Sequence, residues 1–527
     1  MQDYRSRQRH SGVWATMDTP TTSWSEARII GWSAWTPTRI LDHVASAHST
    51  KGIPGDFTVI GRRERAGQVV EIIASSCVAA MPYYYALGID GRVVHGTSVF
   101  EVVQRGGLDW CWSRRALIDL AIFGHTLDED TLHAHVRRFP NDVVAVIRRG
   151  SMRVHEGRQW HSMFTWRGRG SLAHAAECFR SAMADVLADG EDPLVSLSGG
   201  FDSRVLLAGA LAAGARPTLL TMGHEESTDR VVASEIARAL GLEHRIVELR
   251  ARDYLPAGET ITAMTGGTKT AAHWHSYLYP RGAVEHVGPH LVGSNGEFAR
   301  TFYFDRGWAS HVVDTTAYAG IYAQWAARIT RRIGTAARLG LVRPPLARPV
   351  GAVARRTTRL SGRSTHVLDA LDSFYACQRV RHFIGNGLAL YAASGKPRSP
   401  FLDARWIEAS AALPRREKLG AGHHRDLLYR LWPALCQFPI GAEARVLRKA
   451  PAGAWLRHTP PSIGYSPFAE VLEMTAAKER IVECAGLDEV IPRRLRERAV
   501  AEGDEDAKEL LLTLSFVVDK VSDACTG

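Results

Sequence analysis

The clearest chemical signal in the sequence is a loop rich in serine and glycine, SGGFDS at Ser198–Ser203. It follows a short apolar stretch, Leu194–Leu197, and runs directly into a helix-like segment. Glycines let a backbone approach an anion closely, and the N–H groups at the start of a helix favour negative charge. We therefore predict that the loop binds phosphate, with the hydroxyls of Ser198 and Ser203 as additional donors.

A carboxylate inside this loop, Asp202, indicates a metal ion. A carboxylate would repel phosphate unless a cation lay between them, so we interpret Asp202 as a Mg²⁺ ligand beside a polyphosphate. The alternative is a plain strand-to-helix turn, which would not explain why two serines and an aspartate occur together in this loop. The spacing differs from that of GxGxxG and GxxxxGK[ST] loops. A second glycine pair, TGGTKT at Thr265–Thr270, is expected to be an ordinary loop.

The SGGFDS loop resembles the pyrophosphate loop of the ATP pyrophosphatase (PP-loop) superfamily, whose members cleave ATP to AMP and pyrophosphate. Four later segments resemble the asparagine synthetase branch in the order in which that branch has them: LLTMGHEESTDRVVASEIARALGLEH, LVGSNGEFAR, RSPFLDARWIEASAALPRREKLG and GAEARVLRKAPAG. Before the loop, IPGDFTVIGRR, YYYALGIDGRVVHGTS and LDWCWSRRALIDLAIFGHTLDEDTLHAHVRRFPNDVVAVI follow the order of the family's amidotransferase domain. The resemblance spans nearly the whole chain.

This resemblance implies roles for the matched residues. The backbone around Met222 would receive the adenine, Asp229 would open the next helix, and Glu297 would join Asp202 in holding Mg²⁺. Ser294 falls on the position of a catalytic glutamate or tyrosine, and Lys449 lies near the family's essential lysine. The predicted contacts with ATP and pyrophosphate are Ser198, Gly199, Gly200, Asp202, Ser203, Met222 and Gly293, and the predicted catalytic residues are Lys449, Glu297 and Ser294.

One departure from the family concerns the N-terminal part of the chain. A working glutaminase of this type needs a cysteine as its first residue after removal of Met, because the thiolate and the α-amine act together. Position 2 is Gln2, and the first cysteine is Cys77. We therefore expect a degenerate glutaminase-like domain that makes no ammonia from glutamine.

Without ammonia, the resemblance implies a nucleophilic amine that is carried by the substrate itself. The enzyme would use ATP to make an acyl-adenylate, releasing pyrophosphate, and the amine would then close an amide within one molecule. Two branches do this: β-lactam-forming synthetases and lasso peptide cyclases. We favour the lasso cyclase, because Ser294 replaces the tyrosine or glutamate of the β-lactam branch. It would adenylate an Asp or Glu side chain of a leaderless precursor peptide and close a macrolactam with the N-terminal amine.

Other functions stay open at this point. They are a β-lactam-synthetase-like ligase acting on a small amino-carboxylic acid, and a non-catalytic scaffold that binds ATP or peptide for a partner enzyme. Glutamine-dependent asparagine synthesis is nearly excluded by Gln2, and a tRNA-thiolating enzyme is disfavoured by the N-terminal domain and the absence of paired redox cysteines. A leader peptidase and a leader-binding protein would be further partners of a lasso cyclase.

Several histidines are candidates for substrate contact or for the surface. His273 and His275, in KTAAHWHSYLYPRG, could orient the peptide or act as a base. The alternative is that both are ordinary helix-surface or core residues. The stretches HAHVRR (133–138) and GHHRD (422–426) are expected to lie on the solvated surface.

The elements that must position these residues follow from the hydrophobic pattern. Residues 1 to about 165 alternate apolar and polar positions around glycine turns, which predicts strands, and the resemblance implies an Ntn-hydrolase-like αββα sandwich. From Ser171 a capped helix begins, and the following strand–helix alternation is typical of a doubly wound parallel sheet. The chain from about 310 is mostly helical. We predict two domains, residues 1–165 (glutaminase-like) and 166–527 (an asparagine-synthetase-like ligase).

Length and composition agree with this α/β organisation. At 527 residues the chain is too long for one core, and 45% hydrophobic with 23% charged residues is the composition of a globular protein. No apolar run reaches the roughly 18 residues of a membrane span, and the start of the sequence is polar, so we expect a cytoplasmic protein with no membrane insertion. The seven cysteines are scattered, which favours reduced thiols over disulfides or a zinc site.

The net charge of +10 comes from one segment, Arg328–Arg363, which has ten arginines and no acidic residue. Its plain interpretation is a solvated, poorly ordered insertion, with RPPLARPVG breaking any helix. The alternative is a surface that docks an acidic partner or peptide. Nucleic acid is not expected, since aromatic residues are absent from the arginine run.

Overall fold

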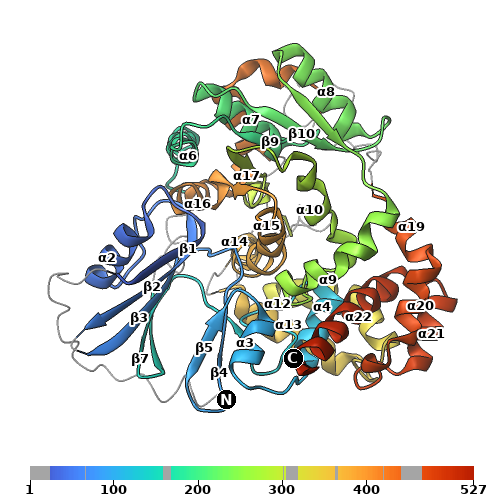
Figure 1. Cartoon of the computed structure of the whole chain (residues 1–527). Helices are drawn as coiled ribbons and strands as arrows, with labels where there is room; N and C mark the ends of the chain where they lie inside the picture. Colours follow the sequence, from blue (N-terminus) through green and yellow to red (C-terminus); the bar gives the residue numbers. More distant parts are fainter. Residues whose placement is uncertain are drawn as a thin grey trace.

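The computed structural model describes residues 24–65, 67–157, 168–300, 302–303, 318–362, 366–418, 421–440 and 466–526. Figure 1 shows antiparallel sheets at the lower left (blue), a parallel sheet at the top (green) and helices from the last part of the chain around them (yellow to red). The predicted mixed α/β fold is confirmed.

Two antiparallel sheets stack face to face in the first part of the chain. The strands of the larger sheet are, in order, β1 (Glu26–Trp32), β2 (Asp56–Arg65), β3 (Gln68–Ser75), β7 (Val143–Arg148) and β8 (Ser151–Glu156). Those of the smaller sheet are β5 (Val93–Gly96), β4 (Tyr84–Leu87) and β6 (Arg137–Arg138). Ile60 and Ile73 of the larger sheet pack with Tyr85 and Phe139 between the two sheets.

One helix covers the outer face of each sheet. Helix α2 (Pro37–Ala47) packs Ile40 and Val44 against Val59 of the larger sheet, and α3 (Val99–Arg105) lies against the smaller one. Val59 faces α2 whereas the next residue, Ile60, faces the other sheet, as the period-two pattern of a strand requires. The layers are therefore helix, sheet, sheet, helix, and the predicted αββα sandwich is confirmed.

The second region contains a sheet of five parallel strands in the order β11–β10–β9–β12–β13. The strands are β9 (Leu194–Ser196), β10 (Thr218–Met222), β11 (His244–Val247), β12 (Pro289–Leu291) and β13 (Lys396–Arg398). The strand order reverses between β9 and β12, and ligands bind in α/β sheets at the carboxyl ends of strands where such a reversal opens a crevice. The loops after β9 and β12 meet at this point.

Both faces of the parallel sheet are covered, as the predicted doubly wound arrangement requires. Val195 and Leu219 belong to the same core as α7 (Phe201–Ala212) and α8 (Thr228–Leu240). Their neighbours Leu194 and Leu220 point to the other face and pack with Tyr279. The predicted helix that begins after Ser171 is α6 (Leu172–Val186), and Ser171 Oγ accepts the N–H of His174.

The rest of the described chain is mainly helical, as predicted. Its helices are α9 (Tyr254–Thr265), α10 (His275–Leu278), α12 (Tyr318–Arg338), α13 (Ala347–Leu360), α14 (Val367–Phe374), the π-helix η6 (Tyr375–Ile384), α15 (Gly385–Tyr391), α16 (Ala404–Ala412), α17 (Arg415–Lys418), α18 (Gly422–Leu431), α19 (Phe468–Glu473), α20 (Thr475–Glu483), α21 (Arg493–Ala501) and α22 (Glu505–Thr526). Among the described residues, no helix combines the length and apolarity needed to cross a membrane.

The sandwich and the later helices pack as closely as parts of one core. A single hydrophobic cluster contains Leu117 of α4 (Arg114–Phe123) together with Leu207 and Leu511. A Cβ added to Gly385 would lie 1.6 Å from the carbonyl oxygen of Ala80. The predicted domain boundary at 165/166 falls in 158–167, outside the described residues, and stays a prediction.

The arginine-rich segment is ordered, so the expectation of a poorly ordered insertion is wrong. Helix α12 buries Ile321, Trp325, Ile329 and Ile333, which recur every four residues along one face. Helix α13 begins at Ala347, and proline is tolerated in the first turn of a helix. The alternation of arginines with these apolar residues specifies an amphipathic helix.

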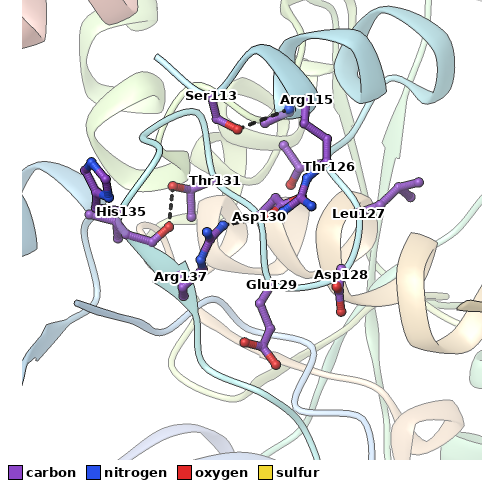
Figure 2. A network of polar contacts seen from close by, with 12 residues as sticks. Ser113, Arg115, Thr126, Leu127, Asp128, Glu129, Asp130, Thr131, His135 and Arg137 are labelled. Carbon is purple, nitrogen blue, oxygen red and sulfur yellow. Dashed lines mark hydrogen bonds and ion pairs between the residues drawn. The ribbon is translucent and has the colours of Figure 1, made fainter. Parts of the chain in front are cut away.

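Arg356 of α13 joins this segment to the sandwich. Its guanidinium contacts Asp119 and donates to Asp130 Oδ2 at 2.7 Å. Asp130 is buried, and its other oxygen accepts from Arg115 (2.5 Å) and Arg137 (2.6 Å); Figure 2 shows the two side chains converging on it. Three guanidinium groups therefore surround one buried carboxylate, beside a second one at Asp119.

Candidate active site

The SGGFDS loop lies between β9 and α7, as predicted. The N–H of Ser198 donates to Ser203 Oγ at 3.0 Å, and the hydroxyls of these two serines lie 2.9 Å apart. The Gly199 N–H donates to Asp229 Oδ1 at 2.8 Å, which ties the loop to the first turn of α8. Within the described residues, no side chain caps the first turn of α7. The uncapped helix start therefore offers its N–H groups and its dipole to an anion.

A second loop, which follows β12, lies directly against the first. A Cβ added to Gly296 would lie 2.5 Å from Asp202 Cγ, and one added to Gly293 would lie 3.2 Å from Asp202 Cβ. Only residues without a side chain fit at this distance. The approach brings Glu297 next to Asp202 from a different strand of the sheet, and Tyr375 Oη donates to Glu297 Oε2 at 2.7 Å.

The two carboxylates differ in their electrostatic surroundings. Burial raises the pKa of Glu297, and the charge of Asp202 adds to this effect. Burial also acts on Asp202, but His424 and Arg300 outweigh it and lower its pKa below the ordinary value. Asp202 is therefore ionised near neutral pH, and Glu297 is the carboxylate that a nearby cation would stabilise most.

Asp202 has two basic neighbours that the sequence analysis did not identify. Arg300 Nη2 donates to its Oδ2 at 2.6 Å, and His424 Nε2 lies 2.8 Å from its Oδ1, although that contact is not aligned as a hydrogen bond. His424 is fully buried, so the expectation of a surface position for GHHRD is wrong, and His133 of HAHVRR is also fully buried. His424, Leu427, Leu428 and Leu431 follow the i, i+3, i+4, i+7 pattern of a buried helix face, which is the signal that could have placed it.

The donor set is compatible with Mg²⁺. This ion prefers oxygen ligands and is commonly held by one or two carboxylates together with phosphate oxygens. Asp202 and Glu297 supply two carboxylates from neighbouring loops, and their repulsion is what such an ion would relieve. Groups of three or more His, Cys, Asp or Glu residues with metal-binding geometry do not occur within the described ranges, so phosphate oxygens would have to complete the coordination.

Ser294 lies in the second loop, and its backbone is well fixed. Its carbonyl accepts the hydroxyl of Ser399 at 2.8 Å. Its neighbour Asn295 has a positive φ of 72° and donates through Nδ2 to the carbonyl of Phe401 at 2.6 Å. The RSPFLD block therefore holds this loop from behind. Met222 ends β10 at the same edge of the sheet.

The family comparison bears on these same loops. Residues 174–295 match the family model described as asparagine synthase, which spans the chain from α6 to the loop after β12. A solved chain titled "Structure of NMN synthetase from Francisella tularensis" is 18% identical, with a TM-score of 0.20, over 26% of this chain and 60% of that chain. No curated protein matches.

Several groups of the candidate site lie beyond the residues that match the family model, namely Glu297, Arg300, Tyr375 and His424. Lys449, the predicted catalytic lysine, lies outside the described residues. The segment that leads toward it is anchored at the phosphate loop by Arg204, which is fully buried. This guanidinium donates to the carbonyls of Gly199 (3.2 Å), Phe438 (2.9 Å) and Pro439 (2.6 Å).

The predicted substrate residues His273 and His275 lie next to each other, with 5.8 Å between their ring centroids, and their role stays a prediction. His273 ends the short helix η3 (Ala271–His273) and its ring packs edge-on against Phe383 of the π-helix, with 4.6 Å between centroids. Burial lowers the pKa of His273 to about 2 and that of His275 to about 4. Both imidazoles are neutral at pH 7, and no contact links either ring to Asp202 or Glu297 within the described residues.

Lys269 is a further basic group that the sequence analysis missed, because TGGTKT was interpreted as a loop without special residues. The side chain is buried, and its Nζ donates to the carbonyl of Phe383 at 3.0 Å and lies over that ring. Burial, aided by Arg379, lowers the pKa of Lys269 to about 7. The π-helix thus connects two clusters: Tyr375 contacts Glu297, whereas Phe383 contacts Lys269 and His273.

Proposed function

We propose that this protein is an ATP-dependent amide ligase that releases AMP and pyrophosphate and closes a macrolactam within a peptide, as lasso peptide cyclases do. The observation that supports the ligase most directly is the meeting of Asp202 and Glu297 above the SGGFDS loop, where the strand order reverses. The asparagine synthase match supports an ATP-dependent ligase forming C–N bonds in general.

In this proposal each described group has a task at the phosphates. The loop and the uncapped start of α7 bind the pyrophosphate portion of ATP. Mg²⁺, held by Asp202 and Glu297, would neutralise the charge that develops on the leaving pyrophosphate. Arg300 and His424 keep Asp202 ionised, and Tyr375 orients Glu297 through its hydrogen bond.

The amine that attacks the adenylate is proposed to belong to the same peptide. Holding both reacting ends in one site replaces a bimolecular encounter and can contribute roughly 7–11 kcal/mol. The N-terminal sandwich is proposed to be inert as a glutaminase. Consistent with this, Cys77, the first cysteine of the sequence, is buried, and burial raises the pKa of its thiol well above the ordinary value.

The test is a product analysis with Mg²⁺ and ATP. The substrates are a leaderless peptide with an N-terminal glycine and an internal Asp or Glu, and a small amino acid that bears an amine and a carboxylate. AMP together with a peptide lighter by one water supports the proposal. AMP only with the small amino acid indicates β-lactam-type chemistry, and no AMP with any substrate indicates a non-catalytic scaffold.

Variants connect the result to the site. Asp202→Asn is expected to lower AMP formation by at least 10²-fold, about 2.7 kcal/mol of transition-state stabilisation. The matched control is Glu235→Gln, which removes one carboxylate from the exposed side of α8 and should leave AMP formation within twofold of wild type. Equal activity in the two variants would contradict the assignment of Asp202.

A further inference from the structure

Two adjoining cavities lie along α12. The first, of about 320 Å³, is bordered by Tyr303, Trp325 and Leu371. The second, of about 650 Å³, is bordered by Thr270 and by arginines of α12. Arg328 and Arg331 line both, so the two cavities adjoin each other along α12. We refer to the two together as the arginine groove.

The arginines of this groove form a stripe along one helix. Arg328, Arg331, Arg332 and Arg338 line the second cavity, and their spacing of three, four and ten residues places them on one side of α12. Arg331, Arg332 and Arg338 are exposed, while Arg328 is half-buried. The buried apolar residues of α12 belong to the core, whereas three of the four arginines are exposed.

The charges of the groove are unbalanced. Its acidic residues are Asp506 and Glu509, and Arg338 already pairs with Asp504. Arg328 lies over the ring of Tyr303, 4.7 Å from its centroid, and neither Arg328 nor Arg332 has a carboxylate at ion-pair distance in the described part of the chain. Burial and the neighbouring Arg332 and Arg331 lower the pKa of Arg328. An anionic ligand would relieve this repulsion.

One end of the groove is connected to the candidate active site through aromatic side chains. Tyr303, which borders the first cavity, packs edge-on against Tyr375 with 6.3 Å between ring centroids. Tyr375 in turn donates to Glu297. A single aromatic layer therefore separates the groove from the two carboxylates. Tyr303 and Tyr375 are both buried, so the groove is linked to the two carboxylates through packed side chains.

We infer that the arginine groove binds an acidic segment of the peptide substrate, outside the ring that is being closed. The inference rests on the proposed function for the identity of the occupant. From Arg328 to Arg338 the helix rises about 15 Å, which four to five extended residues span. The segment therefore carries two or more carboxylates within about five residues. A single-stranded nucleic acid fits less well, because Trp325 and Tyr303 are buried and offer no exposed face for base stacking.

The first experiment measures binding without catalysis. A fluorescein-labelled peptide with alternating Gly and Glu, its Gln counterpart and a labelled oligothymidine are titrated with the full chain, and anisotropy is followed at low and high salt. The acidic peptide is expected to bind at least tenfold more tightly than the Gln peptide, with affinity falling as salt rises. Tighter binding of the oligothymidine would overturn the inference in favour of a nucleic-acid site.

Two triple variants separate the groove from the overall charge. Arg328→Gln/Arg331→Gln/Arg332→Gln is expected to weaken acidic-peptide binding at least tenfold. The control Arg343→Gln/Arg348→Gln/Arg359→Gln removes the same charge from exposed positions of the same arginine-rich segment that do not line the groove, and should weaken it less than twofold. Equal effects of the two variants would overturn the inference, and thermal unfolding verifies that both are folded.

A second measurement links the groove to the substrate and distinguishes the two proposals. With a cyclisable peptide that has an acidic tail, the groove variant is expected to raise KM at least fivefold with kcat unchanged, and a Gln tail on the wild-type enzyme should do the same. If the peptide is cyclised and KM is the same with the groove variant and with the Gln tail as with wild type and the acidic tail, the groove inference alone would be overturned. Acidic-peptide binding without any AMP would leave the groove in place and overturn the proposed function.

Discussion

The close approach of the two active-site loops makes Gly296 a sensitive position. In Gly296→Ala the new Cβ would lie 2.5 Å from Asp202 Cγ and 2.6 Å from its Oδ1. Carbon atoms in contact are about 3.5–4.0 Å apart, so the loop or the carboxylate must move by about 1 Å. Because Asp202 is held by Arg300 and His424, the displacement is shared among all of these groups.

Two consequences are expected from this displacement. Inserting a methyl group into a filled site costs about 1–3 kcal/mol of unfolding free energy. A displacement of about 1 Å in a reacting group can lower the rate by about 10²-fold. We therefore expect Gly296→Ala to remain folded, to lose most of its AMP formation and to bind ATP more weakly in the presence of Mg²⁺ than wild type does.

The assay combines urea unfolding with calorimetric titration of ATP, with Mg²⁺ and with EDTA. Gly395→Ala is the matched control, because its nearest neighbour atom would lie 4.0 Å from the new Cβ. The control should have wild-type affinity and equal or slightly higher stability. If Gly296→Ala has wild-type stability and wild-type ATP affinity with Mg²⁺, the two loops are not packed as described and the placement of Glu297 beside Asp202 is refuted.

Three further substitutions test other parts of the structure. Asp130→Ala leaves the guanidinium groups of Arg115 and Arg137 without their buried partner and leaves Arg356 with Asp119 as its remaining acidic partner, so urea unfolding should show a loss of about 3–5 kcal/mol. The control Glu101→Gln, which breaks the exposed pair with Arg105, should cost less than about 1 kcal/mol. For Lys269, burial lowers the pKa from 10.5 to about 7. Between these pH values the unfolded chain binds more protons than the folded protein, so the free energy of unfolding rises with pH. From pH 7 to pH 9, urea unfolding should show wild type gaining about 2–3 kcal/mol relative to Lys269→Met, and an equal change in both proteins would contradict a buried, neutral amine. Gly385→Ala would force its Cβ against the backbone of Ala80; it should lower the melting temperature by several degrees or prevent folding, whereas wild-type melting would show that this contact is not as close as described.

Local pattern was sufficient for much of the fold and for part of the site. The alternation of residues 194–247 specified β9, α7, β10, α8 and β11, because each element has its own period and its own glycine turn. The loop motif identified Asp202, and the resemblance identified Glu297. The individual strands β1 (Glu26–Trp32) and β13 (Lys396–Arg398) were not predicted. Strand β13 comes just before the Pro-Phe-Leu-Asp segment, and a strand of three residues has no measurable period.

The groups missed around Asp202 are those that only tertiary packing brings close. His424 comes from α18 and Arg300 from the turn after Gly296, and nothing in GHHRD or GEFAR marks either as a neighbour of a carboxylate. Polar residues in a short stretch suggest the surface, yet the apolar residues that follow His424 at helical spacing carried the opposite information. Lys269 was missed for the same reason, since its burial depends on the π-helix far along the chain.

The core shared by the sandwich and the later helices restricts how such a chain can change in evolution. Recombination could replace the sandwich with that of a relative only if three contacts were preserved together. These are the backbone contact of Gly385 with Ala80, the hydrogen bond from the Gly55 N–H to Asp403 (3.1 Å) and the arginines around Asp130. The sandwich is then retained as a folding partner, because deleting it would expose the apolar face on which the later helices depend. Lineages of this architecture should accumulate substitutions on both sides of that boundary in matched pairs, and the two parts should be inherited together.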